Sequence, residues 1–281
     1  MPDIHLLSLK AVEMRLHITR MMEVGKPHHY GGSLSAADIV AALYFYKMHY
    51  DPQHPDWPDR DRFLMSKGHC VPAQYAALAM AGIIDVCELS TLKQLGSRLQ
   101  GHPAMHLTPG IEGCTGSLGH GLSYANGMAL AARISKRNYR VYCLLGDGET
   151  QEGQVWEAAM TASQKCLSNI LAIIDNNGLK AMDSPSCAKT LEPISERWRA
   201  FGWQVREIDG HNMAEICAGL DWAEENQAAP SLLIAHTVKG KGISYMEGQP
   251  AYHNAMLTAD QMAQAVYELE AQRQALEVKH G

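Results

Sequence analysis

Two polar loops in the second half of the sequence carry the residue types best suited to chemistry. Gly-Asp-Gly at 146–148 directly follows the apolar segment 141–145, and Asp-Asn-Asn-Gly-Leu at 175–179 follows the apolar segment 170–174. Glycine lets the backbone approach a phosphate closely, but the carboxylate of Asp147 repels a phosphate unless a cation lies between them. The loops therefore favour a diphosphate held through a metal ion, and a pair of ordinary turns is the alternative.

The donor atoms of these loops restrict both the metal and the ligand. An aspartate, an asparagine side chain and a main-chain carbonyl are hard oxygen ligands, which suit Mg²⁺ or Ca²⁺ and poorly suit Zn²⁺. A nicotinamide dinucleotide is disfavoured, because Gln151 stands where the third glycine of a GxGxxG fingerprint belongs. The chain also lacks the GxxxxGK phosphate loop followed by Ser or Thr.

Four short segments predict the strands that must position these loops. They occupy residues 141–145, 170–174, 203–208 and 231–235, and stretches long enough for helices separate them. Such segments indicate strands buried on both faces of a parallel sheet. We therefore expect an α/β fold, a doubly wound and mainly parallel sheet flanked by helices. Its ligand should lie at the carboxyl ends of the strands, where both polar loops can face it.

Helices are expected in the rest of the chain, above all in its N-terminal third. Apolar residues recur on one face near the N-terminus, and Ser35 with Asp38 three residues later resembles a capping box that opens a further helix. Residues 51–62 are rich in Pro and Asp and predict a loop. The small residues of 116–132 suit a closely packed helix after a glycine-rich entry, and a final helix should start at a Thr258 cap.

Composition limits the class of protein. The 281 residues are 46% hydrophobic and 19% charged, with a formal net charge of −6, so the chain can bury a substantial core. The acidic balance argues against nucleic acid or an anionic membrane as a partner, and no apolar run approaches the roughly 18 residues of a membrane span. With no internal repeat and no linker, we expect a single domain over residues 1–281 and a cytoplasmic location.

The cysteines predict neither a disulfide framework nor a metal cluster. Their number is odd, they are scattered, and none forms a CxxC pair. We expect reduced thiols that are buried or half-buried. The positions are Cys70, Cys87, Cys114, Cys143, Cys166, Cys187 and Cys217.

The surroundings of the two polar loops resemble a known enzyme family. Gly-Asp-Gly at 146–148, followed by the 28 residues 149–176 and then Asn177, is similar to the thiamine diphosphate signature. Further motifs, in the same order along almost the whole chain, resemble the amino-terminal, diphosphate-binding domain of transketolases. These motifs are HYGGSLS at 29–35, SKGH at 66–69, GHP at 101–103, TGSLG at 115–119, GDGETQEG at 146–153, DGH at 209–211 and KGKG at 239–242.

Carried over by position, the resemblance implies a site for thiamine diphosphate and Mg²⁺, with Ca²⁺ or Mn²⁺ as substitutes. The implied metal ligands are Asp147, Asn177 and, through its carbonyl, Leu179. The implied cofactor contacts are His69, Gly116, Ser117, Leu118, Gly148, Glu149, Asn177 and Leu179. The implied catalytic residues, whose imidazoles can donate or accept protons near neutral pH, are His29, His69, His102 and His253.

One departure from the family pattern concerns the first of these histidines. The family usually has glycine before it, whereas His28 precedes His29 here. The sequence therefore leaves open which of the two rings enters the substrate channel. Other histidines, such as His106, His120 and His236, match no family role.

The resemblance also implies a second polypeptide. In transketolases, the glutamate that activates the cofactor and the arginines that bind the sugar phosphate lie in a pyrimidine-binding domain, which these 281 residues do not match. We therefore expect the N-terminal subunit of a split transketolase that transfers a two-carbon ketol unit between sugar phosphates. A separate C-terminal subunit, with pyrimidine-binding and C-terminal domains, would complete an α₂β₂ assembly.

Two alternatives remain open at this point. One is a subunit of another thiamine diphosphate enzyme, similar to a deoxyxylulose-phosphate synthase or to the alpha subunit of a 2-oxo acid dehydrogenase. The other is a non-catalytic protein that binds thiamine diphosphate. The histidines and the KGKG motif at 239–242 favour transketolase over the first alternative. The intact metal ligands and the four histidines argue against the second.

Overall fold

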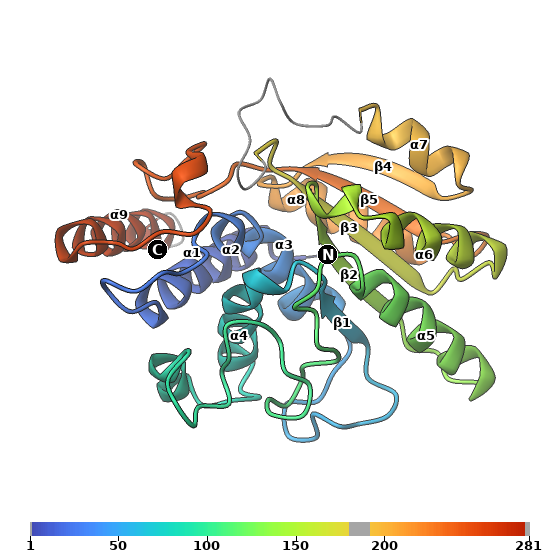
Figure 1. Ribbon diagram of the computed structural model, residues 1–281, viewed down its shortest axis with the longest axis horizontal. Helices are drawn as coiled ribbons and strands as arrows, with labels where there is room; N and C mark the ends of the chain where they lie inside the picture. Colours follow the sequence, from blue (N-terminus) through green and yellow to red (C-terminus); the bar gives the residue numbers. More distant parts are fainter. Residues whose placement is uncertain (1, 180–191, 279–281) are drawn as a thin grey trace.

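A five-stranded parallel sheet forms the centre of the molecule (Figure 1). The computed structural model describes residues 2–179 and 192–278. The strands follow the spatial order β1-β2-β3-β5-β4, and every neighbouring pair is parallel, which confirms the expected fold class. Their bounds are β1 (Arg62–Met65), β2 (Val141–Gly146), β3 (Ile170–Asn176), β4 (Gln204–Asp209) and β5 (Ser231–His236).

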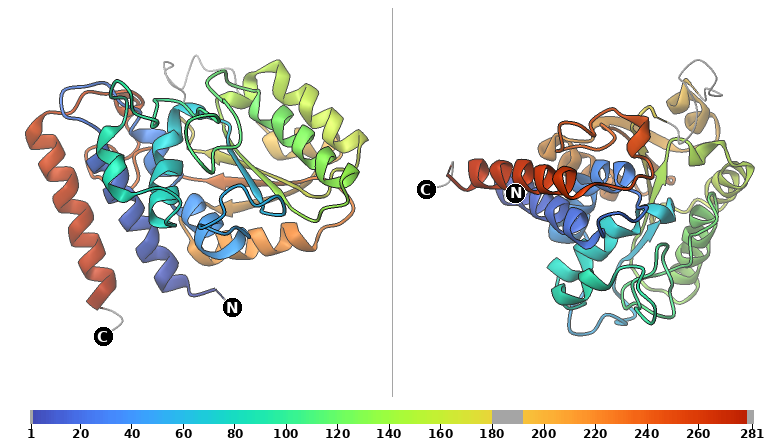
Figure 2. Two further views of the ribbon diagram at one scale, coloured as in Figure 1. Left: turned by 90° about the horizontal axis from the view of Figure 1, so that it is seen from below. Right: turned by 60° about the vertical axis from the view of Figure 1, so that its left-hand side comes forward.

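Helices cover both faces of the sheet, as expected for a doubly wound fold (Figures 1 and 2). Successive strand residues point to opposite faces, so Tyr142 and Leu144 of β2 belong to one apolar core, and Val141, Cys143 and Leu145 belong to the other. The first core includes residues of α1 (Ile4–Met21), α2 (Gly31–Ser35), α3 (Ala37–Ala42), α4 (Val71–Met80) and α8 (Met213–Glu225). The second includes residues of α5 (Gly121–Ile134), α6 (Gly153–Gln164) and α7 (Ile194–Ala200).

The last helix, α9 (Ala259–Val278), lies along α1 (Figure 2) and buries Ala265 and Leu269. It starts at the predicted cap: Thr258 Oγ1 accepts a hydrogen bond from Gln261 N–H at 3.2 Å, and Gln261 Oε1 accepts one from Thr258 N–H at 3.0 Å. Shorter helical turns are η1 (Leu43–Lys47), η2 (Gly68–Cys70), η3 (Val86–Thr91), η4 (Glu149–Gln151) and η5 (Pro250–Tyr252). Across residues 2–179 and 192–278, no helix is long and apolar enough to cross a membrane.

The structure corrects three expectations about these elements. Strand β1 lies in the third of the chain that was expected to be helical, and its four residues are too few to show a periodicity. Strand β4 is an edge strand that pairs with β5 alone. Only its Ile208 is buried, so β4 is not covered on both faces. Ser35 is not a helix cap, because it is the buried last residue of α2 and its hydroxyl donates to Asp175 Oδ2 at 2.6 Å. Helix α3 begins at Ala37 without a side-chain cap.

Close packing at the start of α5 explains part of the run of small residues. A Cβ on Gly121 would lie 2.3 Å from Ser66 Oγ and 2.8 Å from Ser66 Cα. Glycine therefore lets the first turn of α5 press against the segment that follows β1. This contact places the loop before α5 beside that segment, and Leu118 and His69 come to line one pocket.

The described cysteines are free thiols, as expected, but only half of them are buried. Cys70, Cys143 and Cys217 are buried. The other three are exposed, contrary to the expectation, because they lie in surface loops and short turns: Cys87, Cys114 and Cys166. Cys187 lies outside the described residues.

Candidate active site

The loops after β2 and β3 meet at the carboxyl edge of the sheet. The two strands are neighbours, and Gly146 pairs with Asp175 in their register. The carboxylate of Asp147 accepts a hydrogen bond from Gly148 N–H at 2.8 Å and another from Gly178 N–H at 3.1 Å. Asp147 therefore joins the two loops at the place where the parallel sheet predicts that they converge.

A pocket opens between these loops and the segment that follows β1. Eight residues predicted for the site line it: His69, Leu118, Asp147, Gly148, Glu149, Asn177, Leu179 and His253. Gly116, Ser117, His29 and His102 do not line it. The remaining walls come from Gly32, Lys67, Gly146 and Lys239, for which the sequence predicted no contact.

Three oxygen donors in the pocket fit a hard cation. Burial raises the pKa of Asp147, as expected for a carboxylate that is largely removed from water. The side-chain oxygen of Asn177 accepts from Leu179 N–H at 3.2 Å, and the Leu179 carbonyl accepts from Lys239 Nζ at 2.9 Å. That carbonyl already binds one positive group. Carboxylate, amide and carbonyl oxygens suit Mg²⁺, so this donor set fits the predicted metal.

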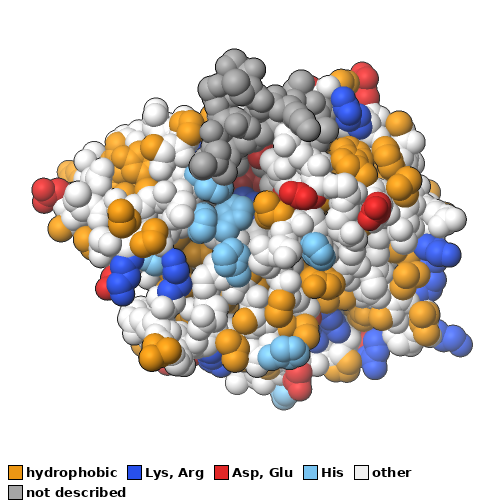
Figure 3. Space-filling view, viewed as in Figure 1, with side chains coloured by type: hydrophobic (Ala, Val, Ile, Leu, Met, Phe, Trp, Pro, Cys, Tyr) orange, Lys and Arg blue, Asp and Glu red, His pale blue; other side chains and the backbone are white. Residues whose placement is uncertain are grey.

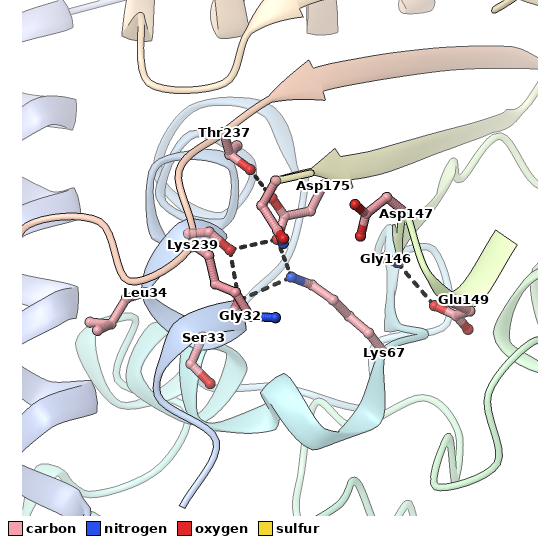
Figure 4. A network of polar contacts seen from close by, with 12 residues as sticks. Gly32, Ser33, Leu34, Lys67, Gly146, Asp147, Glu149, Asp175, Thr237 and Lys239 are labelled. Atoms are coloured by element: carbon pink, nitrogen blue, oxygen red, sulfur yellow. Dashed lines mark hydrogen bonds and ion pairs between the residues drawn. The ribbon is translucent and has the colours of Figure 1, made fainter. Parts of the chain in front are cut away.

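Lys67, which lines the pocket, forms a buried ion pair with Asp175 (Figure 4). Lys67 Nζ contacts Asp175 Oδ2 and also donates to the carbonyl of Gly32 at 3.0 Å. The hydroxyls of Ser35 and Thr237 donate to the same Asp175 carboxylate. Burial opposes the charge on Lys67, but the neighbouring Asp175 raises the pKa of Lys67 to about 12. Lys67 is therefore a fixed cation in the wall of the pocket.

These pocket residues show what sequence reasoning missed. Asp175 is the first polar residue after the apolar residues 170–174 of β3, and a buried carboxylate in that place needs a partner. Lys67 and Lys239 belong to the SKGH and KGKG motifs, but the motifs alone did not show that both lysines face the polar loops. The sequence signal for this ion pair was the carboxylate of Asp175, directly after the apolar residues 170–174.

The carboxylate of Glu149 holds the backbone segments around the pocket by hydrogen bonds. Its Oε1 accepts from Gly119 N–H at 2.9 Å and from Ser66 Oγ at 2.5 Å, and its Oε2 accepts from Gly146 N–H at 3.1 Å. The side chain is buried, although the residue also lines the pocket. Its carboxylate is thus occupied by protein donors from three separate segments, which fixes those segments relative to one another.

The loop with Gly116, Ser117 and Leu118 lies at the rim of the site. All three residues are exposed, and a Cβ on Gly116 would lie 3.9 Å from the His102 side chain. Leu118 remains 37% exposed even though it lines the pocket. An apolar side chain in this place can contact a ligand ring or a neighbouring chain.

The four predicted catalytic histidines form one cluster beside the pocket. The ring centroid of His29 lies 5.0 Å from that of His69, 5.5 Å from that of His253 and 6.3 Å from that of His102. The rings of His69 and His253 are 5.1 Å apart. Figure 3 shows histidine side chains gathered on this face of the molecule. The structure thus brings together four residues that are far apart in the sequence.

The structure also indicates which of the first two histidines faces the cluster. His28 is buried, and its Nε2 accepts a hydrogen bond from Glu23 N–H at 3.1 Å. A two-residue bridge between the backbones of His28 and Ala255, with both N···O distances 3.0 Å, holds this segment extended. Neighbouring side chains of an extended segment point in opposite directions, so His29 faces the cluster.

The clustered imidazoles are neutral at pH 7. Burial is the largest cause, and it lowers the pKa of His29 and of His69 to about 4 and that of His253 to about 3. Burial also lowers the pKa of His102. Neutral rings can each accept one hydrogen bond and donate another, which suits the hydroxyl and carbonyl groups of a polyol.

Comparison with known proteins identifies the family. Residues 8–280 match the family described as "Transketolase, thiamine diphosphate binding domain". The chain belongs to this transketolase family. The predicted resemblance and fold class are thereby confirmed.

Relatives of this transketolase-family chain fall into two length classes. It is 46% identical over 250 residues to 6-deoxy-6-sulfo-D-fructose transketolase subunit SqwG of Clostridium sp. (strain MSTE9), covering 88% of this chain and 91% of that protein. It is 43% identical to a subunit of the apulose-4-phosphate transketolase of Phocaeicola vulgatus, covering 98% of both chains. Against the transketolase of Homo sapiens the identity is 39%, and the match covers 96% of this chain but 43% of the human protein.

Solved transketolase structures agree with this division. The structure of transketolase from Campylobacter jejuni superimposes with a TM-score of 0.89 at 32% sequence identity. The match covers 96% of this chain and 43% of that one. The chain therefore spans less than half of these transketolases, but almost all of the relatives named as subunits.

Proposed function

We propose that this chain is the N-terminal subunit of a two-chain transketolase that transfers a two-carbon ketol unit between sugar phosphates. The observation that carries this proposal is the near full-length match to transketolase subunits, combined with the histidine cluster beside the oxygen-lined pocket. Both relatives are named for sugars with a phosphate or a sulfo group. Both sugars carry an anionic group, and the sugar phosphates proposed for this chain belong to that class. Because such sugars do not cross membranes unaided, we also propose a cytoplasmic location.

The pocket would hold thiamine diphosphate through Mg²⁺. Asp147, Asn177 and the Leu179 carbonyl would bind the metal, and Lys67 and Lys239 would face the anionic diphosphate. Gly116, Ser117, Leu118, Gly148, Glu149 and His69 remain the predicted neighbours of the cofactor. When bound, the cofactor supplies the carbon nucleophile that cleaves a ketose next to its carbonyl. The chain contributes binding, charge compensation and the exclusion of water.

The histidine cluster would handle the substrate. Cleavage and formation of a bond beside a carbonyl create oxyanions and move protons between oxygen atoms. Neutral His29, His69, His102 and His253 can donate hydrogen bonds to such oxygens and accept protons from hydroxyls. Their rings lie within 6.3 Å of at least one other ring of the cluster, so one sugar can contact several of them.

A separate subunit would complete the site, and we propose an α₂β₂ assembly. Three exposed residues lie beside the pocket and can be covered by a second chain: Ser117, Leu118 and Glu152. Leu118 itself lines the pocket, and Glu152 follows the pocket residues Gly148 and Glu149 in the sequence. The cofactor would then lie between two chains, and its binding would favour their association. No role for nucleic acid or a membrane is part of this proposal.

A donor panel tests the proposed reaction. The chain, its partner subunit, thiamine diphosphate and Mg²⁺ are mixed with a set of ketose phosphates and one aldose phosphate, and the products are followed by mass spectrometry. We expect at least one ketose to lose two carbons and the aldose to gain them. A complex that binds the cofactor but transfers two carbons from no ketose would contradict the assigned reaction.

Replacement of His69 by alanine should lower turnover more than cofactor affinity. Loss of a proton-transfer group costs roughly 100-fold or more in kcat. The measurement compares kcat with the dissociation constant of thiamine diphosphate in the two-chain complex. His106→Ala, at an exposed histidine without a predicted role, is the control. A larger effect on cofactor affinity than on kcat would make His69 a structural support instead.

A further inference from the structure

On the basis of the proposed function, we infer that Lys93 recognises the anionic end group of the sugar substrate, a phosphate or a sulfonate. Lys93 follows η3 and precedes the GHP motif, and none of the roles assigned above includes it. It would give this chain a specificity-determining contact of its own, in addition to those expected from the partner subunit.

Lys93 bridges the segments that carry two of the clustered histidines. Its Nζ donates to the carbonyl of Pro27, two residues before His29, at 2.7 Å. Its methylene groups cover Gly101, which directly precedes His102: a Cβ on Gly101 would lie 3.4 Å from Lys93 Cε and 3.5 Å from Cδ. The ammonium group is therefore held beside the histidine cluster and does not extend freely into solvent.

Two lysines, Lys93 and Lys239, lie close enough to the histidine cluster to act on its rings. After burial and the neighbouring histidines, Lys93 further lowers the pKa of His29 and of His102. After burial, Lys239 is the largest cause that lowers the pKa of His253. Lys239 lines the oxygen-rich pocket, whereas Lys93 does not. A sugar that reacts in the pocket and extends past His29 and His102 would bring its far end to Lys93.

The charge of Lys93 is available to a ligand. Among the ion pairs of residues 2–179 and 192–278, none includes Lys93, whereas Arg98 in the same connection pairs with Glu88 at 2.6 Å. An ammonium group has three donors, and the Pro27 carbonyl uses one of them. The exposed side chain can thus offer its other donors and a full charge to a tetrahedral oxyanion.

The chain provides a closely matched control residue. The backbone of Lys93 lies in the left-handed region with φ 61°, and that of Lys136 lies there with φ 56°. Lys136 is also exposed, but it lies just after α5, in the connection that leads into the amino end of β2. Substitution of either lysine therefore has a similar local backbone cost, and only Lys93 is near the histidines.

The test uses the complex of both chains with thiamine diphosphate and Mg²⁺, and compares ribose 5-phosphate with ribose as acceptor. For Lys93→Met, we expect the KM of ribose 5-phosphate to rise roughly tenfold, the loss typical of one charge-assisted hydrogen bond. Its kcat should stay within about twofold, since the group acts in binding. The KM of ribose should not change. Lys93→Arg should retain most of the affinity, and Lys136→Met should match the unaltered complex.

Two results would overturn the inference. An equal rise in KM for both acceptors would show that Lys93 only supports the histidine segments, and an unchanged KM for ribose 5-phosphate would show no contact. Calorimetric binding of the two sugars, measured without turnover, separates this inference from the proposed function. The complex could show a Lys93-dependent preference for ribose 5-phosphate and yet transfer no ketol unit. That result would contradict the proposed reaction but support the proposed role of Lys93. Absence of that preference would contradict the proposed role of Lys93, whether or not the complex transfers ketol units.

Discussion

Asp147→Asn should weaken Mg²⁺-dependent binding of thiamine diphosphate by roughly 100-fold or more, because it removes the anionic ligand among the three predicted metal donors. Gly148 N–H and Gly178 N–H donate to different oxygens of Asp147, so the amide oxygen of the variant can still accept one of these two hydrogen bonds. Loss of the other costs the fold about 1 kcal/mol. The fold should therefore persist, and the loss should be confined to binding. Calorimetric titration of the two-chain complex with cofactor, at fixed Mg²⁺, measures the effect.

Asp209→Asn is the matched control for this experiment. Asp209 ends β4, as Gly146 ends β2, and its carboxylate also accepts from a nearby backbone N–H, that of His211, at 2.8 Å. It does not line the pocket. The control should bind the cofactor normally. If Asp147→Asn binds as tightly as the control, the metal assignment is wrong.

Asp175→Asn should destabilise the fold strongly, because it leaves the ammonium of Lys67 buried without its counter-charge. Lys67 is 3% exposed and Asp175 is fully buried. Removal of one partner from a buried pair costs about 3–5 kcal/mol of unfolding free energy. Urea unfolding of the cofactor-free chain measures this loss. The surface variant Asp59→Asn, which breaks the exposed pair with Arg137, should cost less than about 1 kcal/mol.

A double-mutant cycle separates the ion pair from other effects of the substitution. Lys67→Met combined with Asp175→Asn removes both charges, so the double variant should lose less stability than the sum of the single variants. The hydroxyls of Ser35 and Thr237 donate to different oxygens of Asp175, so the single amide oxygen of Asp175→Asn keeps an acceptor for only one of them, equally in the single and the double variant. Strict additivity of the two losses would show that the two charges do not stabilise each other.

The sequence predicts the elements that carry a strong and local signal. β2, β3 and β5 are apolar runs between helix-length stretches, and polar residues follow directly after β2 and β3. These patterns are sufficient to predict a parallel sheet and the convergence of Asp147 with Asn177 at one edge. β1 has only four residues and follows a polar loop, so no periodicity distinguishes it from its surroundings.

The parts of the site that depend on distant contacts could not be predicted. The direction of the His29 side chain follows from the backbone bridge between His28 and Ala255, which are 227 positions apart in the sequence. The pairing of Lys67 with Asp175 likewise joins the ends of different strands. The Ser35 hydroxyl donates to this Asp175 carboxylate and does not cap a helix. Such interactions depend on which segments the tertiary fold brings together, and local residue patterns do not predict these contacts.

Ketol transfer as a function of subunit ratio tests the central claim most directly. The chain at fixed concentration is mixed with increasing amounts of its partner subunit, at saturating thiamine diphosphate and Mg²⁺ and with a ketose phosphate donor. If two chains share one active site, either chain alone should transfer no ketol unit, and activity should rise to a plateau at one partner per chain. Full activity of this chain without any partner would contradict the proposal of a shared site.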